Sequence, residues 1–481
     1  MASQIGLYYR YIYRENLDFK YRLYQLSKIN DFNKSIDMAN KLINRAVCGS
    51  VGYFASSELE KPFLKLAKTI ESSSDIPYVP KSFLHVMTTS YASGGHTRVV
   101  ERWINTSCAE QTHSVVLLEQ GENVISEALN VCTNKHHGEV ILINEKDLKR
   151  KAKLLRDLGS QYEYIILHVH MWDPTPIVAF GTEDFKRPVI FFNHADNLFW
   201  CCSSIVDILA EIRSNNFAKI RGIDNTFVLR IPFDNSIGDI FSQMSKEQSR
   251  KKVGLPMDKT VILTVGSSQK FETFDGCDFC SVVKEAIVGI PDVVCVGIGP
   301  DEKTGRWNMD KDKFLPVGKI DYGNDYFDYL NACDIYMDSI PIGGGTAKLD
   351  AIQFHKPVVS YSFFKQPFGE IVMGVDSIND KRIFNTVLRR LITDEEFRSE
   401  FANNEYRVAE KFHGTEEWKK NLEQMFSIVP LVHKVNNGFI CGRKRIDELD
   451  IMNVLWWRRS PCKKIGLYDL WHKIKSIGYK G

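Results

Sequence analysis

The sequence predicts an α/β protein with two Rossmann-like domains facing each other across a cleft, a helical N-terminal extension and a basic amphipathic C-terminal tail. Two series of short apolar segments, beginning near Ser82 and Thr260, alternate with stretches of helical composition. Such alternation is typical of parallel sheets with helices on both faces. With 481 residues, of which 44% are hydrophobic, the chain is long enough for two or three domains with proper cores.

The N-terminal extension covers residues 1–80. Its sequence is aromatic and helix-forming, and Tyr13, Leu17, Tyr21 and Tyr24 fall on one helical face. The segment SSSDIPYVP interrupts this pattern and indicates a linker. The first Rossmann-like domain is expected at residues 81–235, with strands in FLHVMTT, HSVVLLEQ, EVILI, YIILHVH and PVIFFNH.

The second Rossmann-like domain is expected at residues 236–430, after a crossover near Pro232 to Ile240. A polar helical stretch, Glu395 to Phe426, closes it. Residues 431–481 form the tail. The strands of the second domain are expected in TVILTVGSS, VVCVGIG, FLPVG, DIYMDS and PVVSY.

Composition excludes several classes of protein. Lys and Arg number 62 against 60 Asp and Glu, so no nucleic-acid partner is indicated. The first residues lack a secretion signal, and no apolar run reaches the roughly 18 residues of a membrane span. Eleven scattered cysteines indicate reduced thiols, and we interpret the lone CxxC of Cys277 and Cys280 as chance. We expect a cytoplasmic protein, either free or peripheral on the inner face of the membrane.

A glycine triplet, Gly343 to Gly345, lies between a predicted strand and a predicted helix. Glycine lets the backbone approach an anion, and the N-terminus of the following helix carries free N–H groups and a positive dipole. We therefore expect a phosphate site formed by Gly344, Gly345 and Thr346, with Asp350 accepting hydrogen bonds from ribose hydroxyls. The alternative is that the glycines only make a tight turn.

Other polar clusters follow neighbouring strands, where ligands bind in open α/β sheets. In the second domain these are Gly266, Ser267 and Gly299, with Lys270 as the cation for a diphosphate. In the first domain Gly94, Gly95 and His96 follow the strand FLHVMTT in a glycine loop, and we expect them to bind the same phosphate-bearing ligand.

Four more polar residues of the first domain are candidates for catalysis: His170, His194, Asp173 and Asp196. A zinc site is the rival interpretation, but neither HxH nor HAD brings a further ligand, so no metal is expected. His168 points away from His170 by strand alternation, which favours a core histidine.

These segments resemble GT-B glycosyltransferases. DIYMDSIPIGGGTAKLDAIQFHKPVVSY is similar to the donor-binding stretch shared in variant forms by glycosyltransferase family 4 and the O-linked N-acetylglucosamine transferase group. LTVGSSQKFE is similar to the strand and loop with the phosphate-binding lysine, YASGGHTRVVERW to the first glycine loop, and VIFFNHAD to the strand ending in a histidine near the donor sugar. The resemblance spans residues 82–425. It implies that residues 81–235 form the acceptor side and that residues 236–430 bind the nucleotide sugar. Family 4 members usually carry two spaced glutamates where this chain has Ile342 and Asp350.

The resemblance implies transfer of a sugar from a nucleotide-sugar donor to a glycan, lipid-linked or protein acceptor, in surface polysaccharide or glycoconjugate synthesis. It implies no cofactor and a metal-independent reaction, with retention slightly favoured over inversion. Two alternatives stay open: a catalytically silent GT-B binding module and a sugar-nucleotide epimerase.

The tail has two interpretations. Residues 441–481 could lie on an anionic membrane surface, or they could pack back on the N-terminal domain with their basic residues solvated. The residues assigned to the membrane in the first interpretation are Trp456, Trp457, Trp471, Arg458, Arg459, Lys463 and Lys464.

Overall fold

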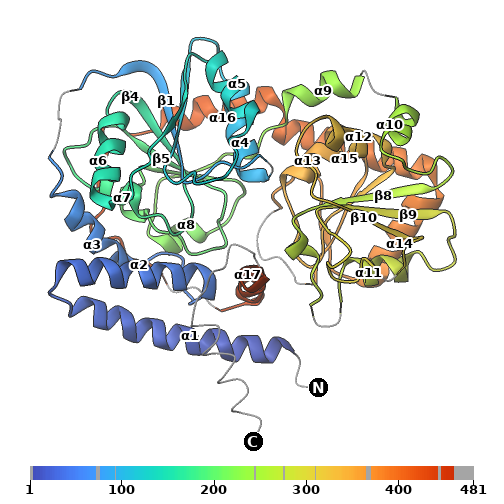
Figure 1. Cartoon of the computed structure of the whole chain (residues 1–481), viewed down its shortest axis with the longest axis horizontal. Helices are drawn as coiled ribbons and strands as arrows, with labels where there is room; N and C mark the ends of the chain where they lie inside the picture. Colours follow the sequence, from blue (N-terminus) through green and yellow to red (C-terminus); the bar gives the residue numbers. More distant parts are fainter. Residues whose placement is uncertain are drawn as a thin grey trace, which may run out of the picture.

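The computed structural model describes residues 4–71, 76–92, 94–242, 245–274, 277–308, 310–363, 370–442 and 446–459. It contains two parallel sheets, each covered by helices on both faces, which lie side by side (Figure 1). The predicted fold class is confirmed. Among the described helices, none is both long and apolar enough to cross a bilayer.

Three helices precede the first sheet. They are α1 Gln4–Ser27, α2 Phe32–Gly49 and α3 Ser57–Ala67. Asp31 caps the start of α2 by accepting a hydrogen bond from the Lys34 N–H, and Ser50 ends this helix in the left-handed conformation. The inner face of α1 packs on α2 and on the last described helix, α17 Glu448–Arg459.

The first sheet has seven strands in the order β3-β2-β1-β4-β5-β6-β7. Its strands are β1 Val79–Met87, β2 Thr112–Leu117, β3 Val140–Leu142, β4 Tyr162–His168, β5 Val189–Asn193, β6 Ile208–Glu211 and β7 Thr226–Val228. Its helices are α4 Gly95–Asn105, α5 Glu127–Lys135, α6 Leu148–Gly159, α7 Thr175–Phe180, η1 Ser203–Ile205 and α8 Phe217–Arg221. β5 is buried along its whole length, which explains its continuous apolar sequence.

The second sheet has six strands in the order β10-β9-β8-β11-β12-β13. Its strands are β8 Thr260–Val265, β9 Val293–Ile298, β10 Phe314–Gly318, β11 Ile335–Met337, β12 Val358–Tyr361 and β13 Ser377–Ile378. Its helices are α9 Asn235–Ser242, α10 Lys246–Lys252, η2 Ser268–Phe271, α11 Phe279–Ala286, α12 Asn324–Ala332, α13 Thr346–Gln353, α14 Lys381–Thr393 and α15 Glu395–His413. In both sheets the central crossover reverses the strand order, and ligands bind at such a point.

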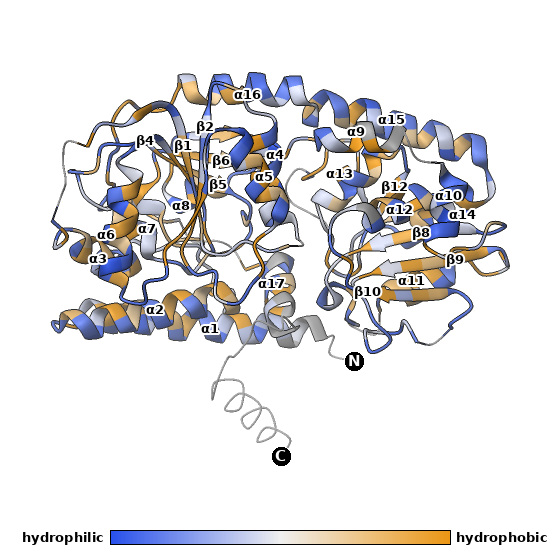
Figure 2. Cartoon of the chain, turned by 45° about the horizontal axis from the view of Figure 1, so that its top comes forward, coloured by the Kyte–Doolittle hydropathy of each residue, from blue (hydrophilic) through white to orange (hydrophobic). Residues whose placement is uncertain are grey.

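Two helices return from the second domain to the first. α16, Thr415–Ser427, continues the line of α15 along one edge of the molecule (Figure 2). Its Trp418 meets Trp103 of α4, with ring centroids 5.4 Å apart, and Phe426 meets Phe83 of β1. The helical stretch Glu395 to Phe426 was expected to close the second domain, and its last helix also packs on the first domain.

The last described helix, α17 Glu448–Arg459, contacts α1, α2 and η2, beneath the junction of the two sheets (Figure 1). This part of the tail packs mainly on the N-terminal extension, whereas the second interpretation placed it on the N-terminal domain. Trp457, assigned above to a membrane interface, is only 6% exposed and meets Trp172 at 5.6 Å between ring centroids. Lys463, Lys464 and Trp471 lie outside the described residues, as do the side chains of Trp456, Arg458 and Arg459.

Candidate functional site

A cavity of about 510 Å³ lies between the two domains, at the carboxyl ends of both sheets. The first domain supplies aromatic and histidine side chains to its wall, and the second supplies the glycine turn and two lysines. α17 adds a third side. The main lining residues are Tyr91, His96, His170, Trp172, His194, Arg213, Lys270, Asp338, Gly343, Gly344, Lys348, Tyr361, Glu370, Met452, Asn453 and Trp457.

Lys270 and the glycine turn form one wall together. The Lys270 Nζ donates a hydrogen bond to the Gly343 carbonyl at 3.1 Å. A Cβ at position 343 would lie 2.6 Å from the Asp338 Oδ2, so only glycine fits there. Gly344 donates its N–H to the Asp338 Oδ1 at 2.9 Å. The turn is thus held on the end of β11, with Lys270 beside it.

Lys348 is a second cation in this wall. It lies in the first turn of α13, is 4% exposed, and pairs with the Asp338 Oδ2 at 3.1 Å. Burial lowers the pKa of Lys270, which Asp338 opposes. Among the charged lining residues, Lys270, Lys348 and Arg213 outnumber Asp338 and Glu370, so the cavity lining carries a net positive charge. A buried or half-buried positive charge favours an anionic ligand such as a diphosphate.

Three histidines form the opposite wall. The His96 ring lies 4.3 Å from that of His194 and 5.9 Å from that of His170, centroid to centroid. Burial lowers the pKa of His96 to about 3 and those of His170 and His194 to about 4. All three imidazoles are therefore neutral at pH 7, and each keeps one nitrogen that can accept a proton.

Hydrogen bonds to backbone carbonyls fix the tautomers of two of these rings. The His96 Nε2 lies 2.6 Å from the His168 carbonyl oxygen, and the His194 Nδ1 lies 3.4 Å from that of Phe192. A carbonyl oxygen only accepts, so these two nitrogens carry the protons. The Nδ1 of His96 and the Nε2 of His194 are left as acceptors.

His168 belongs to the core, in agreement with strand alternation. Its Nε2 lies 3.0 Å from the His85 Nδ1, and the His85 Nε2 lies 3.0 Å from the His113 Nδ1. All three rings are at most 1% exposed. Each contact in this chain of neutral imidazoles pairs two ring nitrogens inside the sheet layer, and none of the three rings lines the cavity.

Asp173 and Asp196, predicted as catalytic carboxylates, do not line the cavity. Asp173 is 7% exposed and accepts hydrogen bonds from Thr88 and from the Thr175 N–H. Asp196 is 2% exposed and forms a two-pronged ion pair with Arg213, at 2.6 and 2.8 Å. Both carboxylates stabilise the first-domain wall of the cavity through these interactions. Arg213 lines the cavity, whereas Asp196 does not.

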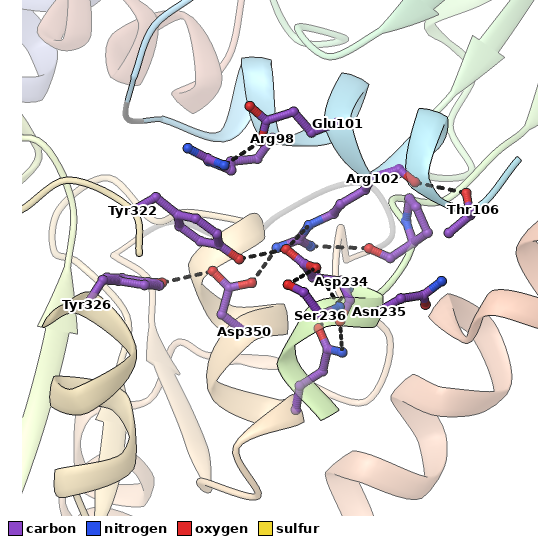
Figure 3. Close-up of polar contacts among 12 residues, drawn as sticks. Arg98, Glu101, Arg102, Thr106, Asp234, Asn235, Ser236, Tyr322, Tyr326 and Asp350 are labelled. Carbon is purple, nitrogen blue, oxygen red and sulfur yellow. Dashed lines mark hydrogen bonds and ion pairs between the residues drawn. The ribbon is translucent and has the colours of Figure 1, made fainter. Parts of the chain in front are cut away.

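Asp350, predicted to meet a ribose, faces the other domain instead (Figure 3). It is 2% exposed, pairs with Arg102 of α4, and accepts a hydrogen bond from the Tyr326 hydroxyl at 2.8 Å. The cause is helix geometry. Residues two apart on a helix point about 200° apart, so Lys348 and Asp350 cannot both face the cavity.

Asp234, on the crossover between the domains, completes this cluster. Its Oδ2 lies 4.0 Å from the Arg102 Nε and accepts a hydrogen bond from Tyr322 at 2.8 Å. Burial raises the pKa of Asp350, which Arg102 opposes. Burial would also raise the pKa of Asp234, but Arg102, Ser236 and Tyr322 hold it below its usual value. A buried ionic cluster thus joins both domains and their crossover.

The first glycine loop and the start of α13 touch each other. Gly94 precedes α4 with φ of 122°, and a Cβ on Gly95 would lie 2.8 Å from the Thr346 Oγ1. Gly345 precedes α13, which begins at Thr346. Gly94, Gly95, Gly345 and Thr346 are not part of the cavity lining. In this structure Gly95 and Thr346 serve the close approach of the two domains.

Gly266, Ser267 and Gly299 lie at the ends of β8 and β9, outside the cavity lining. Gly299 has φ of 104°, and a Cβ there would lie 1.7 Å from the Gly266 carbonyl oxygen. The Ser267 carbonyl accepts a hydrogen bond from the Lys270 N–H at 2.9 Å. These residues support the loop that carries Lys270.

Sequence reasoning missed Lys348, Arg213 and the side of the cavity formed by α17. The signal for Lys348 was present, because it follows the glycine triplet and stands within the first turn of the predicted helix. No comparable signal existed for Asn453, which exchanges hydrogen bonds with Asn197 at 3.0 and 2.9 Å. Within the described part of the chain, no three His, Cys, Asp or Glu side chains are placed to hold a metal ion.

No protein-family model matches this chain, and no curated protein matches it either. Solved structures do match this chain. HepE from Anabaena, in complex with UDP and glucose, is 14% identical over 72% of this chain and 99% of its own, with a TM-score of 0.52. A glycosyltransferase from Rickettsia africae is 13% identical over 73% and 99%, with a TM-score of 0.52.

Sucrose-phosphate synthase from Thermosynechococcus elongatus is 13% identical over 72% of this chain and 98% of its own, again with a TM-score of 0.52. These neighbours have two Rossmann-like domains facing each other across a cleft, and the two sheets described above match that arrangement. The chain therefore has the GT-B fold.

Proposed function

We propose that this protein is a glycosyltransferase that moves a sugar from a nucleotide-sugar donor to a glycan, lipid-linked or protein acceptor, in surface polysaccharide or glycoconjugate synthesis. The observation that carries the proposal is the cavity itself. Its glycine turn, flanked by Lys270 and Lys348, faces neutral histidines across the junction of a GT-B fold. HepE, of the same fold, was solved with UDP and glucose.

The lysine wall would bind the donor diphosphate and stabilise it as it leaves. As the bond to the sugar breaks, negative charge builds up on the leaving phosphate, and nearby fixed cations stabilise that charge. Lys270 and Lys348 supply these cations without a metal ion. Closure of the cavity excludes water and protects the donor from hydrolysis.

The acceptor proton can leave in one of two ways. In a retaining transfer the departing phosphate takes it, and the protein needs no base. In an inverting transfer a base on the opposite face is needed, and the His194 Nε2 or His170 could serve. We favour retention, because Asp173 and Asp196 are tied up in hydrogen bonds away from the cavity.

Nucleotide binding gives the first test. We expect one of UDP, GDP, CMP and dTDP to raise the melting temperature by a few degrees, because a ligand that binds only the folded state stabilises it. A response to none of the four would contradict a donor site.

The Lys270→Ala variant tests the leaving-group role. We expect its turnover to fall by about 10²–10³-fold, as when one preorganised donor to a developing anion is removed. The nucleotide-induced shift should fall as well. Lys319→Ala, an exposed lysine of the same domain, is the matched control and should keep both.

Turnover and nucleotide binding, measured together, separate the transferase from the two alternative functions. Turnover of the donor only when an acceptor is added excludes an epimerase. Nucleotide binding without turnover of any donor supports a silent binding module. Normal turnover in Lys270→Ala would exclude the proposed role of this wall.

A further inference from the structure

The outer face of α1 carries a stripe of exposed apolar and aromatic side chains. Tyr13, Leu17, Tyr21 and Tyr24 are 59%, 50%, 60% and 62% exposed. All four lie within about 60° of Leu17 around the helix, at about 100° per residue. Exposed patches of this kind mark interaction surfaces. We call this stripe and the basic residues beside it the outer face of α1.

Basic residues share the outer face of α1. Arg10, Arg14 and Lys28 are exposed, Lys20 is partly exposed, and Lys28 stands over the Tyr24 ring at 5.2 Å. Arg10, Arg14 and Lys20 lie within the same angular range as the apolar stripe, and Lys28 directly follows the helix. The face therefore combines aromatic rings with positive charge along the whole helix.

The acidic residues of α1 are turned away from this face. Glu15 is 3% exposed and accepts a hydrogen bond from Arg45 at 2.9 Å. Asp18 lies to the side, where it bonds Arg22 at 2.8 Å and also pairs with Arg45. No acidic residue of α1 therefore offsets the positive charge of the outer face.

We propose that the outer face of α1 docks on an anionic lipid bilayer surface. Tyrosine suits the membrane interface because its ring is apolar and its hydroxyl stays hydrated. Arginine and lysine beside such rings bind lipid phosphates, and a helix that combines both lies flat on the membrane. The inner face of α1 is already occupied by α2 and α17, so the helix is rigidly presented.

The position of α1 links this surface to the cavity. Ile12 of α1 packs in one apolar cluster with Ile451 and Val454 of α17, and Tyr8 meets Phe274 of the second domain at 6.1 Å. α17 also lines the cavity through Met452, Asn453 and Trp457. Docking would therefore bring the cavity close to the bilayer. On the function proposed above, a lipid-linked acceptor fits this geometry best among the three acceptor classes.

Sedimentation of the full chain with vesicles tests the docking proposal without any assay of turnover. One set of vesicles contains phosphatidylcholine alone, and the other contains equal parts of phosphatidylcholine and phosphatidylglycerol. We expect binding to the anionic vesicles only, and weaker binding at high salt because exposed charges are screened. Equal binding to both sets, or to neither, would overturn the proposal.

Two variants address the outer face directly. Two double variants should each weaken binding to the anionic vesicles at least about tenfold: Arg10→Glu with Arg14→Glu, and Tyr21→Ser with Tyr24→Ser. All four side chains are exposed, so the fold should survive, and unchanged melting curves check this. Each double variant has a matched control. For the charge change it is Lys419→Glu with Lys420→Glu on α16, which lies at the opposite edge of the molecule (Figure 2). For the loss of apolar surface it is Val131→Ser with Val288→Ser, at two exposed valines.

Two outcomes would assign the interaction elsewhere. If Lys463→Glu with Lys464→Glu abolishes vesicle binding while the α1 variants keep it, the tail is the docking element and the proposal fails. If light scattering shows a dimer that the α1 variants dissociate, the outer face of α1 binds a second copy of the chain. Loss of turnover with intact vesicle binding would instead count against the proposed function alone.

Discussion

Lowering the pH from 7 to 5 is expected to reduce the free energy of unfolding by several kcal/mol. Burial holds the pKa of nine described histidines below the ordinary value in the folded state, and the seven most deeply buried of them carry most of the effect. The unfolded chain binds these protons below about pH 6.5, whereas the folded chain does not, so stability falls as the pH falls. Each histidine contributes up to about 1.4 kcal/mol per pH unit. The seven are His85, His96, His113, His168, His170, His194 and His413.

Five buried carboxyl groups act in the opposite direction, and three of them are Glu101, Asp350 and Glu405, whose pKa burial raises. Burial raises the pKa of Glu60 and of Glu211 to about 7. The folded state therefore holds their protons between the ordinary glutamate pKa and pH 7, which adds stability as the pH falls. Because these carboxyl groups are fewer than the histidines, they reduce the effect of the histidines but do not cancel it.

Urea unfolding at pH 7, 6 and 5 measures this dependence. The midpoint should fall steadily while the slope with denaturant stays constant, because the surface exposed on unfolding does not change. His137→Asn, at an exposed histidine, should leave the pH dependence unchanged. A midpoint independent of pH would show that the histidines are not held neutral.

Replacing Arg102 by leucine is expected to destabilise the protein by about 3–5 kcal/mol, the usual effect of removing one partner of a buried ion pair. Arg102 pairs with Asp350, lies near Asp234, and donates to the Pro232 carbonyl at 3.2 Å. Without it, two carboxylates that are 2% and 9% exposed lose their cation. The effect should appear as a lower urea midpoint at pH 7.

A double-mutant cycle separates the pair from its surroundings. Arg102→Leu with Asp350→Leu should recover part of the loss, since an apolar pair of similar volume is often close to neutral. Tyr326→Phe, which removes only a donor to Asp350, should cost far less. If Arg102→Leu alone cost under about 1 kcal/mol, the cluster would not be the buried interdomain link that the structure shows.

The fold was largely predictable because its strands are short, apolar and separated by helices. Every strand expected from the sequence has a counterpart. β6, β7 and β13 were missed, since ILAE, TFV and SI are too short to stand out from loops. Their place in the sheets depends on hydrogen bonds to neighbouring strands, which a local pattern does not contain.

From the sequence, the candidate site could be predicted only as a set of residues at the carboxyl edge of each sheet. Lys270, His96, His170 and His194 all follow strands or precede helices at the carboxyl edge, and all four line the cavity. The same argument from position at the carboxyl edge selected three aspartates whose carboxylates form hydrogen bonds or ion pairs inside the protein instead: Asp173, Asp196 and Asp350. The difference depends on the angle at which each side chain leaves its loop or helix.

The sequence by itself determined the two parallel sheets, the glycine turn after β11 and the lysine on the loop after β8. Periodicity and strand-end position are local properties that a single chain reveals. Only the tertiary structure decided which side chains meet across the domains. Lys348 rather than Asp350 lines the cavity, and α17 closes it, because these choices depend on helix rotation and on contacts between residues hundreds of positions apart, such as Arg102 and Asp350.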